Sequence, residues 1–300
     1  MITGYFMCTS KITLRKFVKL MGQVYFYRWL FFVIFVVAGY EEVTMMKMVK
    51  LLMPVWNFQT NFVSCFIGFW LTIPFLNILV QNMTKRQHEC LLLLSLGMYT
   101  ILGSVPGFNV NMNYLTWFGL VYLCAAYIRL YPNKLFEKRR LWGWMTLLCV
   151  SLASISIIVM QIRYGKYYSM PGYYLMSDSN RFFAVAVAVC SFLWFKNIDI
   201  KYSKVINAFG AGTFGVLLIH AASDAMRQWL WVDTLDVVGH YALPFGSLVL
   251  YSFAAVLGIF IVCNLIDQLR IATLEKSFLK WYDQKVAVKA AHYIERITIK

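Results

Sequence analysis

Charged side chains are scarce in this 300-residue chain, because Lys, Arg, Asp and Glu together make up only 14% of it. A soluble domain carries about 25% charged residues and roughly 45–50% apolar residues. This sequence is 61% hydrophobic, and no soluble fold of its size can hide so much apolar surface from water. The composition therefore excludes a cytosolic enzyme, a secreted disulfide-bonded domain and a disordered chain, and it predicts a membrane protein.

Cysteine and histidine lack the spacings that metal and redox sites use. The seven cysteines are scattered and nearly all lie in apolar stretches, without a CxxC pair, so we expect no disulfide framework and no metal site. Acidic residues are also few, at 13 against 28 basic ones. The resulting charge of +15 is carried by short loops between apolar runs, which argues against a nucleic-acid partner.

Long apolar runs are the dominant feature that is present. Eight of them approach the ~20 residues that a helix needs to cross a bilayer. They are continuously apolar and lack the period-two alternation of barrel strands, so helices are expected. The sequence thus predicts an all-α polytopic transmembrane bundle of about eight spans. The expected spans cover residues 22–40, 61–80, 90–105, 114–131, 141–161, 181–195, 205–222 and 241–265.

The loop charges predict an orientation. Twenty of the 28 Lys and Arg residues fall on one side of the expected spans and six on the other. The positive-inside rule then places both termini in the cytoplasm of a multi-pass inner-membrane protein. Residues 1–265 are expected to be membrane-embedded, and residues 266–300 to form a cytoplasmic basic tail. That tail is either a solvated helix or a helix lying on anionic lipid headgroups.

A glycine pattern inside one span resembles a nucleotide fingerprint. Gly210, Gly212 and Gly215 form G-x-G-x-x-G, and Asp236 follows at a suitable distance. The fingerprint requires a preceding strand, however, and this pattern lies within an apolar helix, so we reject a dinucleotide site. We expect instead that the glycines let neighbouring helices approach closely.

The same helix is expected to carry an ionisable group at its end. His220 and Asp224 are four residues apart, and Arg227 follows Asp224 by three, so a continuous helix places all three on one face. Asp224 can then orient the imidazole of His220 and raise its basicity, as a general base requires. The alternative interpretation is an interfacial histidine beside an ordinary surface ion pair.

Two further clusters are candidate binding sites. The loop over 163–180 contains Tyr167 and Tyr168, whose rings can stack on a sugar or form an aromatic belt at the headgroups. Arg15, Lys16 and Lys19 precede the first span. They can bind the phosphates of a coenzyme, or they can serve only to control topology.

Four stretches then form a recognisable series: MITGYF at 1–6, FWLTIPFLN at 69–77, a stretch at 117–131 ending in AAYIRLY, and GVLLIH at 215–220. In this order they resemble the acyltransferase 3 family of bacterial membrane-embedded O-acyltransferases. The resemblance implies transfer of a small acyl group, usually acetyl, from cytoplasmic acyl-coenzyme A to a hydroxyl of an envelope glycan or lipid.

The resemblance also implies roles for the candidate residues. The enzyme class is an acyltransferase for groups other than aminoacyl groups, with acyl-coenzyme A as donor substrate and no tightly bound cofactor. His220 and Asp224 are then expected to assist catalysis, and Arg15, Lys16 and Lys19 to contact the coenzyme phosphates. Arg227, Tyr167 and Tyr168 are expected to bind the acceptor.

The resemblance has one departure with a consequence for activity. The family usually has ten helices, and its first carries an Arg and a His held to be essential. The segment 1–6 resembles the end of the second helix, so we expect the first to be missing and transfer by this chain to be near zero. Two other classes stay open: a small transporter or flippase, which should show inverted repeats or paired broken helices, and a non-catalytic envelope-assembly partner.

Overall fold

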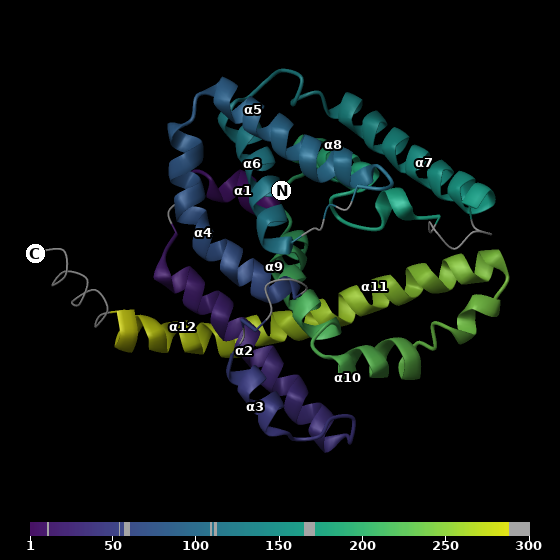
Figure 1. Ribbon diagram of the computed structural model, residues 1–300. Coiled ribbons are helices and arrows are strands. Elements are labelled where there is room, and N and C mark those ends of the chain that lie inside the picture. Colours follow the sequence, from purple (N-terminus) through teal and green to yellow (C-terminus); the bar gives the residue numbers. More distant parts are fainter. Residues whose placement is uncertain are drawn as a thin grey trace, which may run out of the picture. The chain divides into compact units, whose positions relative to one another are not determined.

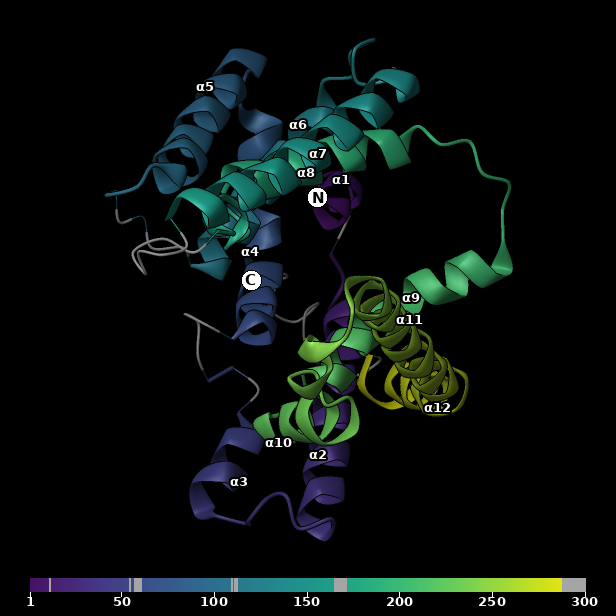
Figure 2. The same cartoon turned by 90° about the vertical axis from the view of Figure 1, so that its right-hand side faces the viewer.

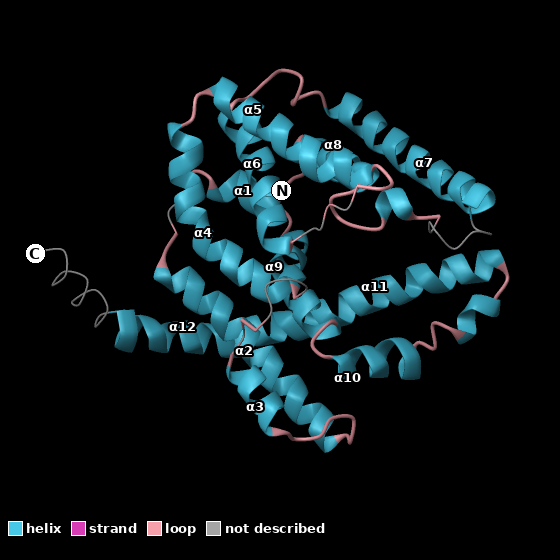
Figure 3. Ribbon diagram, viewed as in Figure 1, coloured by secondary structure: helices cyan, strands magenta, loops and turns pink. Residues whose placement is uncertain are grey.

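The computed structural model describes residues 1–10, 12–53, 55–56, 61–108, 110, 113–164 and 172–287. Within these ranges every regular element is a helix and no strand occurs (Figure 1, Figure 3). The predicted all-α class is therefore confirmed. The chain divides into two compact units, Met1–Ile12 with Val55–Ile200 and Thr13–Pro54 with Lys201–Lys300.

The first unit is built around α6, which packs against α1, α4 and α5, while α7 pairs with α8. Polar side chains start its helices: Asn61 accepts from the Ser64 backbone amide at 2.9 Å, and Thr84 forms a capping box with Gln87. Its helices are α1 (Ile2–Met7), α4 (Phe62–Asn82), α5 (Lys85–Leu96), η1 (Gly97–Leu102), α6 (Tyr114–Leu130), α7 (Arg139–Tyr164), η2 (Tyr174–Met176) and α8 (Phe182–Lys196).

The second unit combines an early helix pair with the last third of the chain. In it α2 contacts α3, α9 and α10, and α9 and α11 lie side by side (Figure 1, Figure 2). Its helices are α2 (Leu14–Val37), α3 (Met45–Leu52), α9 (Lys204–His220), α10 (Asp224–Arg227), η3 (Gln228–Thr234), η4 (Gly239–Ala242), α11 (Phe245–Arg270), η5 (Ile271–Glu275), α12 (Lys276–Tyr282) and η6 (Asp283–Ala287).

Helix length decides how many of these elements can cross a bilayer. Each of the eight predicted ranges falls on a helix, yet α6 and α8 have only 17 and 15 residues. At about 1.5 Å per residue even the longer one extends for about 26 Å, short of the ~30 Å hydrocarbon core. In the described chain four helices are long and apolar enough, or five if one bent pair is a single span, so the predicted count of eight is not met. The four are Leu14–Val37, Phe62–Asn82, Arg139–Arg163 and Phe245–Val286.

The last of these helices is too long for the membrane alone. It continues from α11 through η5, α12 and η6, and the 42 residues Phe245–Val286 would extend for about 63 Å, about twice the hydrocarbon core. Part of it must therefore lie outside the hydrocarbon. The helix passes through residues 265 and 266 without a break, and its hydrogen bonding switches to π turns only at Ile271–Glu275 and Asp283–Ala287.

Candidate functional site

The helix that carries His220 ends at that residue. Its successor α10 begins after Ser223, whose hydroxyl accepts a 3.1 Å hydrogen bond from the Met226 backbone amide. Serine favours this N-cap position, so a new helix starts there, bent by 96° from α9. The prediction that His220, Asp224 and Arg227 share the face of one continuous helix is therefore wrong.

His220 is oriented by its own helix. Its Nδ1 lies 2.7 Å from the backbone oxygen of Val216. A carbonyl oxygen only accepts hydrogen bonds, so Nδ1 carries the proton, and a neutral ring keeps its free lone pair on Nε2. The Val216 carbonyl thus orients the ring and fixes its tautomer. The sequence had predicted that Asp224 orients this ring.

Asp224 pairs with Arg227 instead. Its Oδ1 accepts from Nη1 of Arg227 at 2.7 Å, and the two side chains are 96% and 59% exposed. This is the ion pair between residues three positions apart that the sequence predicted. An ion pair so open to its surroundings contributes little to stability.

The tyrosine loop is described only in part. Tyr167 and Tyr168 lie outside the described residues. Further along the same loop, the Tyr174 hydroxyl accepts from Nη1 of Arg181 at 3.1 Å, and the guanidinium lies 4.3 Å from the centre of that ring. The neighbouring Tyr173 presents an exposed ring.

Two of the three cations proposed for coenzyme phosphates already have acidic partners within the second unit. Arg15 forms a two-bond pair with Asp283, with Nε to Oδ1 at 2.9 Å and Nη2 to Oδ2 at 3.0 Å. Nζ of Lys19 lies 2.7 Å from Oε1 of Glu275. Lys16 lies exposed on the same turn of α2 as these residues. A phosphate would therefore have to compete with two carboxylates.

These pairs belong to a polar stripe on α2. Arg15, Lys19, Gln23 and Tyr27 recur every four residues and so occupy one face of the helix. Gln23 Nε2 and the Tyr27 hydroxyl both donate to Oδ1 of Asp267, at 3.3 Å and 2.7 Å. The stripe thus joins α2 to the helix that ends the described chain.

The centre of this contact is a buried group of charges. Asp267 and Arg270 are 0% and 6% exposed. Arg270 donates from Nε to Asp267 Oδ1 at 2.7 Å and from Nη1 to Glu275 Oε2 at 2.8 Å. With Lys19 the group holds two acids and two bases, so its formal charge is zero. Removing ions from water costs several kcal/mol each, and this mutual pairing offsets the penalty.

Two glycines of α9 make room for the polar side chains of α11. A Cβ on Gly212 would lie 2.7 Å from Oδ1 of Asn264, and one on Gly215 would overlap the carboxyl group of Asp267. Asn264 Nδ2 also donates to the backbone oxygen of Phe209 at 2.8 Å. The expectation that these glycines permit close helix approach is confirmed. At the third glycine of the pattern, Gly210, a Cβ would meet only open space.

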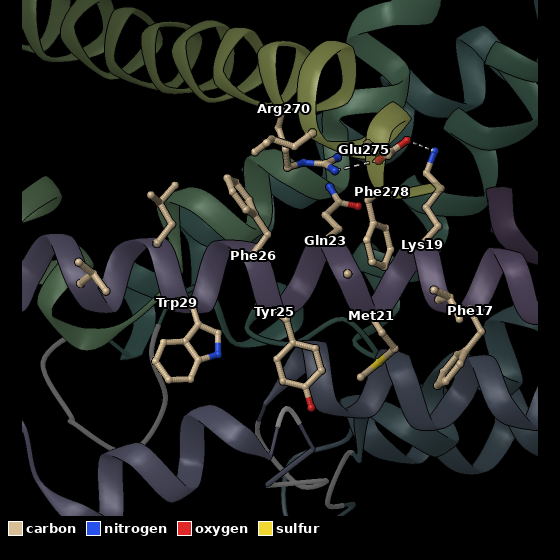
Figure 4. Close-up of a pocket in the computed structure, with 15 residues that line it drawn as sticks. Phe17, Lys19, Met21, Gln23, Tyr25, Phe26, Trp29, Arg270, Glu275 and Phe278 are labelled. Atoms are coloured by element: carbon tan, nitrogen blue, oxygen red, sulfur yellow. Dashed lines mark hydrogen bonds and ion pairs between the residues drawn. The ribbon is translucent and has the colours of Figure 1, made fainter. Parts of the chain in front are cut away.

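A cavity of about 930 Å³ lies beside the buried charges, along α2 and the end of the last helix. Figure 4 shows Lys19 and Gln23 turned toward Arg270 and Glu275. The remaining walls are almost entirely apolar and aromatic. They comprise Phe17, Val18, Met21, Gly22, Tyr25, Phe26, Trp29, Leu30, Val33, Leu274 and Phe278.

Sequence reasoning missed this charged group. A signal for it exists, since Asn264, Asp267 and Gln268 interrupt an otherwise apolar run near the end of a predicted span. Ionisable residues inside membrane helices face partners or cavities and mark functional sites. The partners themselves, on α2, cannot be read from local spacing.

The stretches at 1–6, 69–77 and 117–131 meet in the first unit. A Cβ on Gly4 of α1 would lie 2.9 Å from the backbone of Tyr122 on α6. Asn77 of α4 donates to the backbone oxygen of Met7 at 3.0 Å and accepts from the Tyr122 hydroxyl. The Met7 carbonyl at the end of α1 thus accepts from Asn77 and also from the Ser10 backbone amide, at 3.1 Å.

Comparison of the chain with protein-family models, with curated proteins and with solved structures found no match. Over the described residues, His, Cys, Asp and Glu form no group of three or more that could hold a metal ion. The site residues must therefore be judged by their own geometry. On that basis the strongest candidates are His220 and the buried charges of the second unit.

Proposed function

We propose that this protein is a multi-pass membrane O-acyltransferase that moves a small acyl group, in the first instance acetyl, from acyl-coenzyme A to a hydroxyl of an envelope glycan or lipid. The observation that carries the proposal is the joint packing of α1, α4 and α6 through Gly4, Asn77 and Tyr122. These helices contain three of the four stretches that resemble acyltransferase 3 sequences, and their contacts make the stretches parts of one structure.

His220 has the chemistry that the reaction needs. In acyl transfer to a hydroxyl, the oxygen attacks the thioester carbonyl carbon, the carbon–sulfur bond breaks, and the coenzyme leaves as a thiolate. The hydroxyl proton is taken by Nε2 of His220, because the bond from Nδ1 to Val216 leaves Nε2 as the basic nitrogen, and the departing thiolate takes up a proton from water. Asp224 assists only through the local field.

The remaining candidates have binding roles in this proposal. Arg15, Lys16 and Lys19 contact the coenzyme phosphates, with Arg15 and Lys19 exchanging Asp283 and Glu275 for phosphate oxygens. Arg227 is assigned to acceptor binding, and so, separately, are Tyr167 and Tyr168. In these roles the cations of α2 face phosphate groups, and the tyrosine rings face the acceptor.

The protein is proposed to lie in the cytoplasmic membrane with both termini in the cytoplasm. The 20-to-6 division of basic residues supports this orientation. Four full-length spans keep both termini on one side, whereas a bent pair that crosses as a fifth span would place them on opposite sides. The donor, acyl-coenzyme A, is then on the side that carries the basic residues.

The test is transfer of radiolabel from acetyl-coenzyme A to the glycan and lipid fractions of membranes that contain the chain preceded by a first helix of the family pattern, because we expect transfer by the 300 residues alone to be near zero. Loss of a general base lowers rates by about 10²–10⁴-fold, so His220→Ala should reduce labelling by at least that lower bound. His240→Ala is the matched control, because Nδ1 of His240 also hydrogen-bonds a carbonyl four residues earlier, that of Asp236 at 2.8 Å. Equal labelling by both variants would refute the role of His220, and labelling no higher than in membranes without the protein would refute the enzyme.

One observation favours a small transporter as a second candidate. Lys204–His220 and Asp224–Ala242 form a broken span or a re-entrant loop, bent by 96°. Transporters use broken helices to bind solutes at membrane depth. Uptake of a solute by vesicles that contain the protein, without any label transfer, would favour this class over the acyltransferase.

A further inference from the structure

The cavity along α2 has the shape of a groove within the second unit. Its floor follows Val18, Gly22 and Val33, which lie along one side of the helix. At Gly22 the Phe278 ring packs into the space that a side chain would take, with its Cε1 3.1 Å from where a Cβ would lie. Figure 4 shows Phe26 and Phe278 on the side of Arg270, whereas Tyr25 and Trp29 leave α2 on the opposite side, so aromatic rings flank the floor on both sides.

The groove lies on a helix that is long and apolar enough to cross a bilayer. Its lining on α2 runs from Phe17 to Val33, a helix length of about 24 Å at about 1.5 Å per residue. One leaflet of the hydrocarbon core is about 15 Å deep, half of the ~30 Å total. The groove is therefore long enough to hold an acyl chain that extends through one leaflet.

One end of the groove is basic. Arg15, Lys16 and Lys19 lie within the first two turns of α2, and the Lys19 side chain is 48% exposed although its ammonium group contacts Glu275. Arg270 and Glu275 line the same end from the last helix, and the four cations exceed by one the three acids Asp267, Glu275 and Asp283. An apolar slot that ends in cations complements a molecule with a long hydrocarbon chain and a negatively charged head.

We propose that this groove is a binding site for a phospholipid with an anionic headgroup. One acyl chain lies along the floor between the aromatic rows, and the headgroup phosphate lies beside Lys19. The ammonium of Lys19 donates to the phosphate with hydrogens that do not point to Glu275, since it has three to offer. The proposal concerns the second unit alone and does not depend on acyl transfer.

The observations favour a lipid over a protein segment. A bound strand or irregular segment would bring backbone amides that need partners, and the walls away from Lys19, Gln23, Arg270 and Glu275 offer almost none. An acyl chain has no such requirement. The cationic end further favours an anionic headgroup over a zwitterionic one.

The test uses the full chain in phosphatidylcholine nanodiscs that contain a trace of photoreactive lipid, with a diazirine in the acyl chain. Two probes with the same chain are compared, one a phosphatidylglycerol and the other a phosphatidylcholine. After irradiation, adducts are mapped by mass spectrometry. We expect them to concentrate in residues 17–33 and 274–278, with at least threefold more from the phosphatidylglycerol probe, and unlabelled phosphatidylglycerol should compete.

Matched variants separate a site from general lipid contact. Val33→Trp fills the groove, and Val159→Trp changes a valine on α7 of nearly the same exposure, 54% against 55%. The first should lower adducts in residues 17–33 at least threefold, and the second should leave them unchanged. Lys19→Met should remove the headgroup preference, whereas Lys85→Met, which changes another ion-paired lysine, should keep it.

The wild-type mapping is decisive without any variant. Equal adduct yields from the two headgroups, or adducts spread evenly over α2 and α7, would overturn the proposal. An absence of lipid adducts from residues 17–33 would overturn it as well.

Discussion

Tyr27 and Asp267, 240 residues apart in the sequence, are joined by a 2.7 Å hydrogen bond between α2 and α11. The same oxygen of Asp267 also accepts from Gln23 and Arg270. One buried carboxylate therefore holds an early helix and the last helix together. Its charge is balanced locally, and this contact is the point in the second unit at which substitution should have the largest effect.

Asp267→Asn should strongly destabilise the second unit. The change keeps the shape but removes the negative charge beside Arg270, and breaking a buried ion pair costs about 3–5 kcal/mol. Unfolding by SDS titration in mixed micelles, followed by circular dichroism, measures the loss. Asp224→Asn is the control, because that carboxylate is exposed and its change should leave the midpoint unmoved. Equal midpoints for both variants would contradict the assignment.

Gly215→Ala should also destabilise the fold, through overpacking. The new methyl group would overlap the Asp267 carboxyl, and forcing atoms into a packed site costs about 1–3 kcal/mol. Gly210→Ala, on the same helix but facing open space, should be neutral or slightly stabilising because alanine favours helix. The thermal unfolding midpoints of the two variants in detergent provide the comparison. A Gly215→Ala midpoint at or above that of Gly210→Ala would show that the helices can separate freely.

Asn77→Ala should loosen α1. The variant removes the bond from α4 to the Met7 carbonyl, which keeps only the Ser10 amide, and it leaves the Tyr122 hydroxyl without its acceptor; an unsatisfied polar group costs about 1–3 kcal/mol. Hydrogen exchange of the amides of Ile2–Met7 should accelerate. Asn82→Ala should not change it, since that amide bonds only within its own helix, to the Ile78 carbonyl at 2.7 Å. Unchanged exchange in Asn77→Ala would mean that Asn77 does not anchor α1.

The orientation prediction can be tested with epitope tags. A tag inserted at Asp178, in the loop with few basic residues, should be reached by protease from outside intact spheroplasts. A tag fused after Lys300 should be cut only in inverted vesicles, because the positive-inside rule retains the basic tail in the cytoplasm. If both tags were cut from the same side, the predicted orientation would be wrong.

The amino-acid sequence by itself determined the helical class and the position of each apolar helix, because hydrophobicity and helix period are local properties. Local spacing also determined the Asp224–Arg227 pair and the close approach at Gly212 and Gly215. Span number was less well determined, since an apolar run shows that a segment prefers lipid but not that its helix is long enough to cross.

Only the tertiary structure decided which residues act together. After His220 the chain can either continue the helix or start a new one capped by Ser223, and the local sequence is compatible with both. The structure shows the second. The partners of Arg15 and Lys19 come from residues more than 250 positions away. A cationic side chain can pair with any carboxylate that lies nearby. Its actual partner is therefore fixed by how the helices pack, and packing is a property of the whole unit.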